Sequence, residues 1–253
     1  SLPSGRMLRL PTVLREHPIP LVGLAGPEEL VAVFEDGVTQ QQGPKDLCYM
    51  RVEASSVFTS SKTAKASATM GSTDEVASAK DLSQTVSLQW LQKHRHEMPV
   101  AICLFANCSE SESEWKQEEP AVLNLLDVIR YNCRGKNIRL LVAFVSSSSE
   151  IVMEERITAF RRRTDLEKSN VFHFGKHDDD TTRLQKFLLE HALNQCKDEG
   201  RRARKEKKEA EGRPRGPNLS ARQNFKIAFF AECRKDFKAA LKHYTAAYTT
   251  AKE

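Results

Sequence analysis

The sequence predicts an α/β domain with a small, mainly parallel sheet in a three-layer arrangement, followed by the start of an α-helical solenoid. Residues 100–106 and 138–145 form apolar runs that are typical of strands covered on both faces. Amphipathic segments alternate with these strands, which favours parallel pairing through right-handed crossovers. The final thirty residues carry two further amphipathic segments, which predict a helical hairpin.

The α/β domain is expected over residues 81–197. Its first helix is predicted from Leu82, Val86 and Trp90, and it should end near His94 or His96. A second helix should begin at Glu118–Pro120, after a flexible acidic loop that contains Trp115. A short strand is expected at 171–174. The buried stripes of this helix and of two later helices are predicted from the following residues: Val122, Leu125, Leu126, Ile129 and Cys133; Met153, Ile157 and Phe160; Leu184, Phe187, Leu188, His191 and Ala192.

Residues 1–80 are predicted to be an extended leader with a low-complexity insertion, partly disordered. Four prolines fall within the first twenty residues, and ten of the nineteen residues at 55–73 are Ser or Thr. Such a stretch buries too little apolar surface to offset the entropy cost of ordering it. Residues 21–25 are a weak strand candidate, and residues 28–34 are compatible with a short helix.

Residues 198–220 are predicted to be a basic linker, because a charged segment leads into a run of Gly and Pro. Eight Lys or Arg and three Glu lie between residues 201 and 215, while the remaining charges cancel within the net charge of +5. We therefore expect the basic character to belong to this segment and not to a folded face. The cations expected to contact an anionic surface are Arg201, Arg202, Arg204, Lys205, Lys207 and Lys208.

Residues 221–253 are predicted to be the first hairpin of a truncated solenoid. The pattern from Asp236 to Tyr248 resembles the second helix of a tetratricopeptide-type (TPR-like) repeat, in which small residues admit the paired helix and aromatic residues fill the gap. One repeat cannot bury its own apolar face, so we expect the natural chain to continue. The predicted packing and protein-contact residues are Phe225, Phe229, Phe230, Phe237, Ala240, Tyr244, Ala247 and Tyr248.

Residues 222–230 and the run 236–248 resemble the entry to the foie gras domain of the TRAPP complex subunit 11 family. Three earlier blocks resemble it in the same order: residues 90–94, Trp115–Lys116, and residues 126–137. The resemblance covers roughly residues 85–253. It implies a scaffold subunit of a vesicle tethering and Rab-exchange complex in ER-to-Golgi and intra-Golgi transport. It also implies contacts with other TRAPP subunits, an indirect link to a Rab GTPase, and a cytoplasmic protein peripheral to Golgi and ER–Golgi intermediate membranes.

The sequence shows none of the common signatures of an enzyme, and we expect no catalytic residue, cofactor or metal. It lacks a phosphate-binding GxxxxGK[ST] loop, a GxGxxG turn and a GxSxG elbow. His173 and His177 have the spacing of a helical metal pair, but they fall in a strand and at a helix start. Asp178 or Asp179 is better explained as a helix cap. Cys103 is best explained as a small core residue, with no activating partner identified for it or for Cys108.

Two alternatives remain open at this stage. The first is an adaptor that binds RNA or an anionic membrane through residues 201–215, although this segment contains no aromatic residue for base stacking. The second is a degenerate α/β enzyme, which would place a polar pocket at the carboxyl ends of the strands. The confinement of charge to a linker favours the scaffold, and no nucleic acid is expected as a partner.

Overall fold

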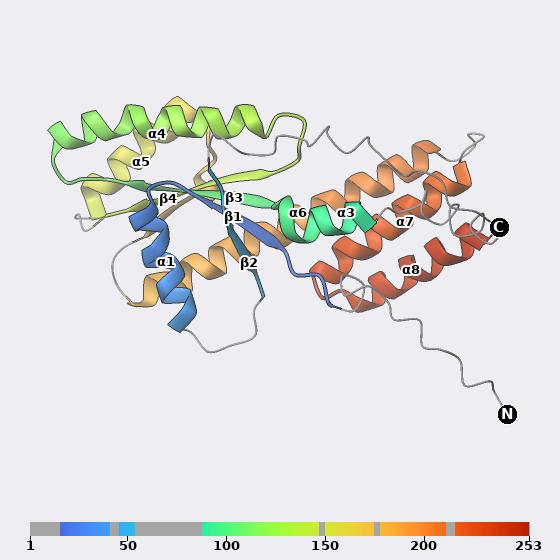
Figure 1. Ribbon diagram of the computed structural model, residues 1–253. Coiled ribbons are helices and arrows are strands. Elements are labelled where there is room, and N and C mark those ends of the chain that lie inside the picture. Colours follow the sequence, from blue (N-terminus) through green and yellow to red (C-terminus); the bar gives the residue numbers. More distant parts are fainter. Residues whose placement is uncertain are drawn as a thin grey trace, which may run out of the picture. The chain divides into compact units, whose positions relative to one another are not determined.

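The computed structural model describes residues 16–40, 46–53, 88–146, 150–174, 178–210 and 216–252 (Figure 1). The chain divides into two compact units. Unit 1 combines the described residues of Ser1–Ile19, Glu75–Glu97 and Gly200–Glu253. Unit 2 combines those of Pro20–Asp74 and Met98–Glu199. Helix α6 (Asp178–Ala210) contributes residues to both units.

Unit 2 contains a parallel five-stranded sheet with the order β2-β1-β3-β4-β5. Strand β1 pairs with strands on both sides: Val22 lies opposite Tyr49 of β2 and Ala101 of β3. Because the chain order reverses between β1 and β3, this sheet has the switch point at which doubly wound proteins bind ligands. The strands are β1 (Leu21–Ala25), β2 (Cys48–Arg51), β3 (Ala101–Asn107), β4 (Arg139–Val145) and β5 (Val171–Phe174).

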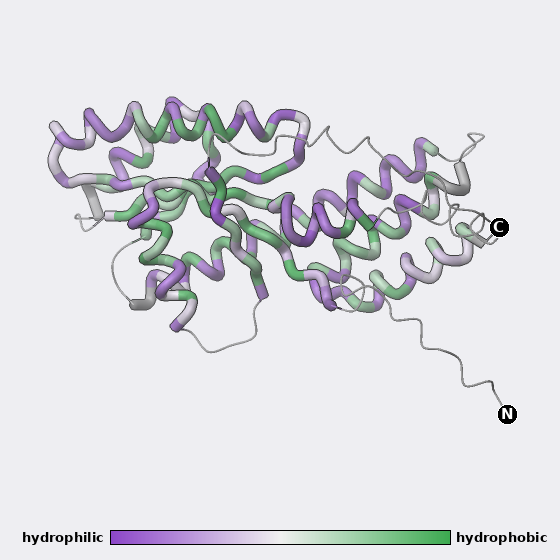
Figure 2. Tube along the Cα trace, viewed as in Figure 1, coloured by the Kyte–Doolittle hydropathy of each residue, from purple (hydrophilic) through white to green (hydrophobic). Residues whose placement is uncertain are grey.

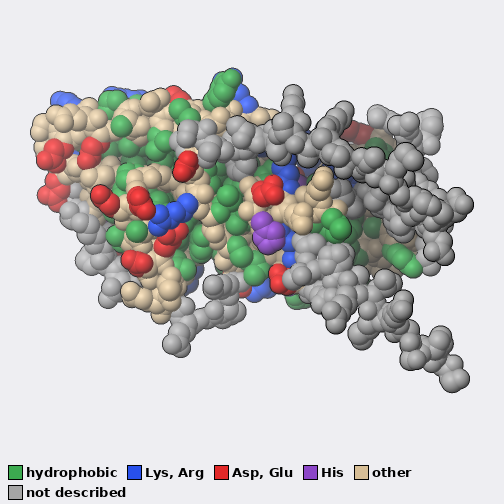
Figure 3. Space-filling model, viewed as in Figure 1, with side chains coloured by type: hydrophobic (Ala, Val, Ile, Leu, Met, Phe, Trp, Pro, Cys, Tyr) green, Lys and Arg blue, Asp and Glu red, His purple; other side chains and the backbone are tan. Residues whose placement is uncertain are grey.

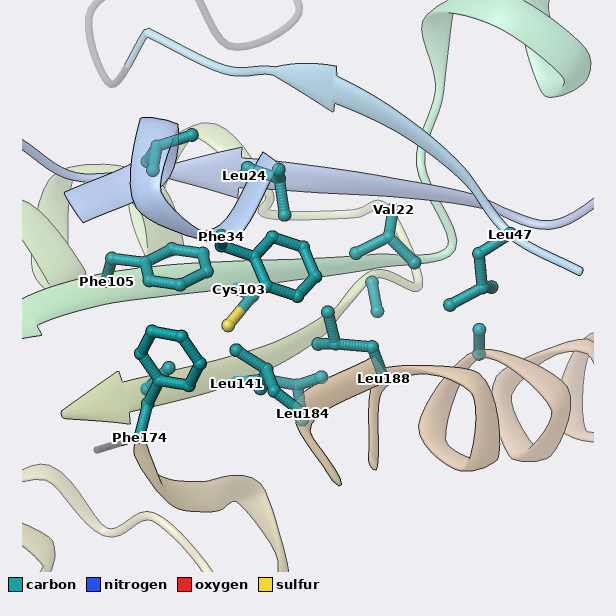
Figure 4. Close-up of a cluster of buried hydrophobic side chains, with 14 of the residues drawn as sticks. Val22, Leu24, Phe34, Leu47, Cys103, Phe105, Leu141, Phe174, Leu184 and Leu188 are labelled. Atoms are coloured by element: carbon teal, nitrogen blue, oxygen red, sulfur yellow. The ribbon is translucent and has the colours of Figure 1, made fainter. Parts of the chain in front are cut away.

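Helices cover both faces of this sheet and give the predicted three layers (Figure 1). On one face, α1 (Glu28–Gln40) and α6 enclose a core that contains Phe34, Phe105 and Leu188 (Figure 4). On the other face, α4 (Glu112–Asn132) and α5 (Glu150–Thr164) enclose a second core. Alternate residues of the central strands serve the two cores, since Cys103 belongs to the first and Leu104 to the second.

Helix α4 begins earlier than the sequence predicts. Ser111 caps its first turn, with the side-chain oxygen accepting a hydrogen bond from the Glu114 amide, and Pro120 lies inside the helix. Trp115, predicted to lie in a flexible loop, is therefore a buried residue of α4 (Figure 2 shows this helix alternating between hydrophobic and hydrophilic residues). Pro120 correctly predicted that a helix is present, but the predicted start of that helix was wrong.

The predicted extended leader is wrong for residues 21–40 and 48–51. These residues form β1, α1 and β2, and they supply two of the five strands. The weak strand at 21–25 and the short helix at 28–34 are therefore present, whereas β2 has no counterpart in the sequence prediction. Burial of Val22, Leu24 and Phe34 in the first core explains why this segment is ordered. The low-complexity stretch 55–73 lies outside the described residues.

Unit 1 is helical in its described part. It contains α3 (Leu88–Gln92), the π-helical turn η2 (Lys93–Glu97), the end of α6, α7 (Gly216–Cys233) and α8 (Phe237–Lys252). The predicted linker at 198–220 is wrong for most of its length, because α6 continues to Ala210 and α7 begins at Gly216. Buried Ala203 and Ala210 give this charged stretch an apolar face that holds it in a folded unit. Residues 211–215 lie outside the described residues.

Candidate interaction surface

The switch point of the sheet is poorly suited to a phosphate group. Gly26 follows β1 with a φ of 125°, and a Cβ atom there would lie 2.3 Å from the Phe105 carbonyl oxygen. Glu28 and Glu29 then occupy the first turn of α1, where their negative charges oppose anion binding at the helix N-terminus. Acidic side chains gather around α1 on the face of unit 2 shown in Figure 3.

The polar groups that follow β3 hold their own loop. The Glu118 carboxylate accepts hydrogen bonds from Asn107 Nδ2 and Ser109 Oγ at 2.8 Å each, and from the Ser109 amide at 3.2 Å. The buried guanidinium of Arg156 donates to the backbone carbonyls of Ser109 and Glu110. These donors and acceptors form hydrogen bonds with one another, so they stabilise the loop and are not arranged as a ligand-binding site.

The described residues contain no group of three or more His, Cys, Asp or Glu placed to hold a metal ion. His173 lies on β5, while His177 lies outside the described residues. Cys103 and Cys108 are buried, and desolvation raises the pKa of both thiols, which leaves them protonated and unreactive. Asp180 is buried in α6 with Arg183 Nη1 at 2.9 Å.

The hairpin of α7 and α8 turns sharply at its linker. Lys235 adopts a φ of 59°, and Asp236 then caps α8 by accepting a hydrogen bond from the Ala239 amide at 3.1 Å. Ala240 and Ala247 are buried, as expected where small residues allow two helices to approach closely. Tyr244 donates a hydrogen bond of 2.7 Å to Glu232 of α7, and burial together with this carboxylate raises the pKa of Tyr244.

An aromatic cluster joins α3 and η2 to α7. Trp90 stacks on His94 with ring centres 4.0 Å apart, and the edges of Phe229 and Phe230 pack against both rings. His94 Nδ1 lies 2.8 Å from the Trp90 carbonyl oxygen. Burial lowers the pKa of His94 to about 4, with smaller contributions from the charges of Lys93 and Lys226. His94 is therefore neutral at neutral pH and acts as a packing residue.

The structure separates the predicted aromatic contact residues into three groups by burial. Phe229 and Phe230 are buried in the aromatic cluster, so they serve as packing residues of α7 and not as an exposed contact surface. Phe225 and Tyr244 are half-buried, with ring centres 5.3 Å apart. Phe237 and Tyr248 are exposed, at 59% and 60%. No sequence pattern indicated that α3 covers α7, because the two helices lie far apart along the chain.

The exposed aromatic residues belong to a continuous apolar stripe. Phe237, Leu241, Tyr244 and Tyr248 follow the spacing i, i+4, i+7, i+11, which places them along one side of α8. Leu241 is 69% exposed and was not among the predicted contact residues, although this spacing identifies it. We call these four residues the α8 stripe. A stripe of this length on the surface of a helix is the usual mark of a contact with another apolar element.

The predicted basic residues lie on a helix. Arg201, Arg202, Arg204, Lys205 and Lys208 are exposed on α6, and Lys207 is half-buried with its Nζ 3.2 Å from Asn224 Oδ1. The described part of unit 1 contains fifteen Lys and Arg and six Asp and Glu. The expectation that the positive charge resides in a linker is therefore wrong, because a folded unit carries it.

Residues 84–183, from just before α3 to the first turns of α6, match the family model described as the trafficking protein particle complex subunit 11 N-terminal domain. The resemblance predicted from the sequence is confirmed. The chain is 28% identical over 174 residues to trafficking protein particle complex subunit 11 from Gallus gallus, and 27% identical to the proteins of that name from Bos taurus and Homo sapiens.

These alignments cover 65% of this chain and 15% of each relative. The chain thus spans a small part of the length of the curated relatives that it matches. The family model matches the segment that carries β3, β4 and β5 of the sheet. Among the described residues, no helix combines the length and apolar character that a membrane crossing requires.

Proposed function

We propose that this protein is a non-enzymatic scaffold subunit of a TRAPP-type vesicle tethering and Rab-exchange complex in ER-to-Golgi and intra-Golgi transport. The observation that carries the proposal is the match of residues 84–183 to the subunit 11 N-terminal domain, together with three relatives named as subunits of that complex. In this proposal the protein acts through contacts with other TRAPP subunits and affects the Rab GTPase indirectly. It associates peripherally with Golgi and ER–Golgi intermediate membranes.

The geometry of unit 2 supports a role without catalysis. At the switch point, two glutamates occupy the helix turn that would face an anionic ligand, and Gly26 packs against the backbone of β3. Beyond β3, Glu118 and Arg156 are committed to loop hydrogen bonds. An enzyme of this fold class would be expected to present free polar groups at this edge of the sheet. This protein instead uses them to fix the β3–α4 loop.

The α8 stripe is proposed as a contact with a following helical hairpin of a TPR-like solenoid. Each such hairpin buries its apolar side against its neighbour, and small buried residues at Ala240 and Ala247 leave the aromatic residues for the next contact. The relatives extend far beyond the aligned 15% of their length, which leaves room in such proteins for further repeats. The partner surface is therefore expected to be helical and apolar.

Affinity purification of the full-length protein from its own cells tests this proposal. We expect the other TRAPP subunits to co-purify with it in stoichiometric amounts. A variant with Leu241→Glu and Tyr248→Glu should reduce their recovery at least about tenfold, because two charges buried against the following hairpin would disrupt the solenoid through which the subunits are proposed to bind. The matched control is Tyr131→Glu, which changes a 67% exposed tyrosine of α4.

The control variant should co-purify as the wild type does. Equal loss in both variants would assign the effect to solubility and would remove the α8 stripe as the contact. Absence of TRAPP subunits from the wild-type eluate would refute the proposed function itself.

A further inference from the structure

In the C-terminal part of α6, positively and negatively charged side chains lie on different sides of the helix. At 100° per residue, Arg201, Arg204, Lys205 and Lys208 fall within an arc of about 100°. All four side chains are exposed, and the buried Ala203 and Ala210 lie on the opposite side. We call these four residues the α6 cationic face. They point away from the surface that α6 packs inside unit 1.

The two glutamates of this segment lie outside the arc. Glu206 is turned toward α7, where it accepts a hydrogen bond from Gln223 at 2.9 Å and pairs with Lys226 at 3.9 Å. Glu209 approaches Lys205 at 3.9 Å, but exposed pairs of this kind contribute little and are screened by salt. Neither glutamate therefore neutralises the α6 cationic face.

The surroundings of this face have the same sign. The excess of Lys and Arg in the described part of unit 1 extends over α7 and α8, with Arg222, Lys238 and Lys242 all exposed. The charges of Arg204 and Lys207 also lower the pKa of His243 on α8, after the larger effect of burial. A summed positive potential attracts anionic surfaces over about a Debye length.

We propose that the α6 cationic face binds the headgroups of anionic phospholipids at a membrane surface. The four cations are spread over about 11 Å along a convex helix, which suits an array of phosphates in a plane better than a single strand held in a groove. Residues 200–210 include no aromatic side chain to stack on a base, which disfavours RNA. The proposal gives a lipid class and a surface to the peripheral membrane association proposed above, and it rests on that part of the proposed function.

Vesicle flotation with the purified chain tests the proposal without any other subunit. The probes are vesicles of phosphatidylcholine alone and vesicles with about 30% phosphatidylserine, since anionic lipid is what attracts Lys and Arg. We expect binding to the anionic vesicles alone, weakening steeply as salt is raised. Replacing Arg201, Arg204, Lys205 and Lys208 with Gln should reduce binding by roughly tenfold or more, because each cation near the surface contributes.

The matched control replaces four exposed cations of unit 2, Lys116, Arg162, Lys168 and Lys186, with Gln and so removes the same net charge. It should retain most of the binding. Equal loss in both variants would show attraction to net charge alone and would overturn the proposal, as would unchanged binding in the α6 variant. Binding of a single-stranded RNA without binding of anionic vesicles would also overturn it.

The scaffold proposal and the lipid proposal can each be refuted without the other. The α6 variant is expected to co-purify with TRAPP subunits as the wild type does, since the α8 stripe is intact. Loss of that co-purification with vesicle binding unchanged would assign the face to a protein contact and would overturn the lipid proposal alone.

Discussion

Individual side chains hold the loop at the end of β3 in place, and Arg156 is the most important of them. Its buried guanidinium donates to two backbone carbonyls, lies 3.5 Å from Glu112 Oε2 and sits 5.8 Å from the centre of the Trp115 ring. Arginine suits this position because its planar fork satisfies several acceptors at once. The loop therefore depends on one residue of α5 that is distant from it in the sequence.

Replacing Arg156 with Ala should destabilise unit 2 by about 2–4 kcal/mol, because two carbonyls lose their donors and Trp115 loses a packing partner. Urea unfolding followed by Trp115 fluorescence in a Trp90→Phe background measures the change. Arg156→Lys should recover part of the lost stability, because lysine keeps the positive charge but lacks the planar guanidinium group with its several donors. Exposed Arg162 of the same helix is the control, and Arg162→Ala should change stability by less than about 0.5 kcal/mol. Similar losses at both positions would contradict this role.

His94 gives unit 1 a pH dependence. Its pKa is about 4 in the folded protein and 6.5 in the unfolded chain, so the unfolded state binds more protons between these values. The free energy of unfolding should therefore be unaffected above about pH 6.5 and should fall by at most about 3 kcal/mol as the pH drops to 4.

Urea unfolding of the wild type and of His94→Phe at pH 7 and pH 4.5 tests this dependence. The variant keeps a ring against Trp90 and should lose less stability on acidification than the wild type. His96→Phe changes an exposed neighbour and should behave as the wild type does. An equal loss of stability in wild type and His94→Phe would place the acid sensitivity elsewhere.

At the level of elements, the sequence predicted those whose signal is local. The strands β3 and β4 are apolar runs, and α5 has a clear stripe, so each was placed within a few residues. Strand β2 was missed because Cys48–Arg51 is only four residues long, lies at the sheet edge and has no fully buried residue. Its place depends on pairing with β1, which no local pattern encodes.

The helical part shows the same limit. Charge and glycine content predicted a linker at 198–220, but the buried alanines of α6 recur at a spacing of seven and give it a packing face. Sequence spacing placed Phe237 and Tyr248 on one side of α8, where both side chains are exposed. It could not show that Trp90 and His94 cover Phe229 and Phe230, because that contact joins helices more than 130 residues apart.

For the whole molecule, the two units differ in construction and in charge. Unit 2 is a sheet with a core on each face, and the described part of unit 1 is a set of helices around an aromatic cluster. The excess of Lys and Arg belongs to unit 1, whereas acidic residues gather around α1 in unit 2 (Figure 3). This division places both proposed contact surfaces, the α8 stripe and the α6 cationic face, on the helical unit.

Separate cores predict separate responses to core mutations. Phe229→Ala should destabilise unit 1 by about 3–5 kcal/mol, and Phe105→Ala should do the same in unit 2, because each leaves a cavity in a buried cluster. Hydrogen exchange measured by mass spectrometry distinguishes the two effects. Phe229→Ala should speed exchange in α7 and α8 and leave β3 and β4 protected, with the converse for Phe105→Ala. Equal loss of protection throughout the chain in either variant would show that the units unfold as one, and the proposed contact surfaces would then depend on the integrity of the sheet.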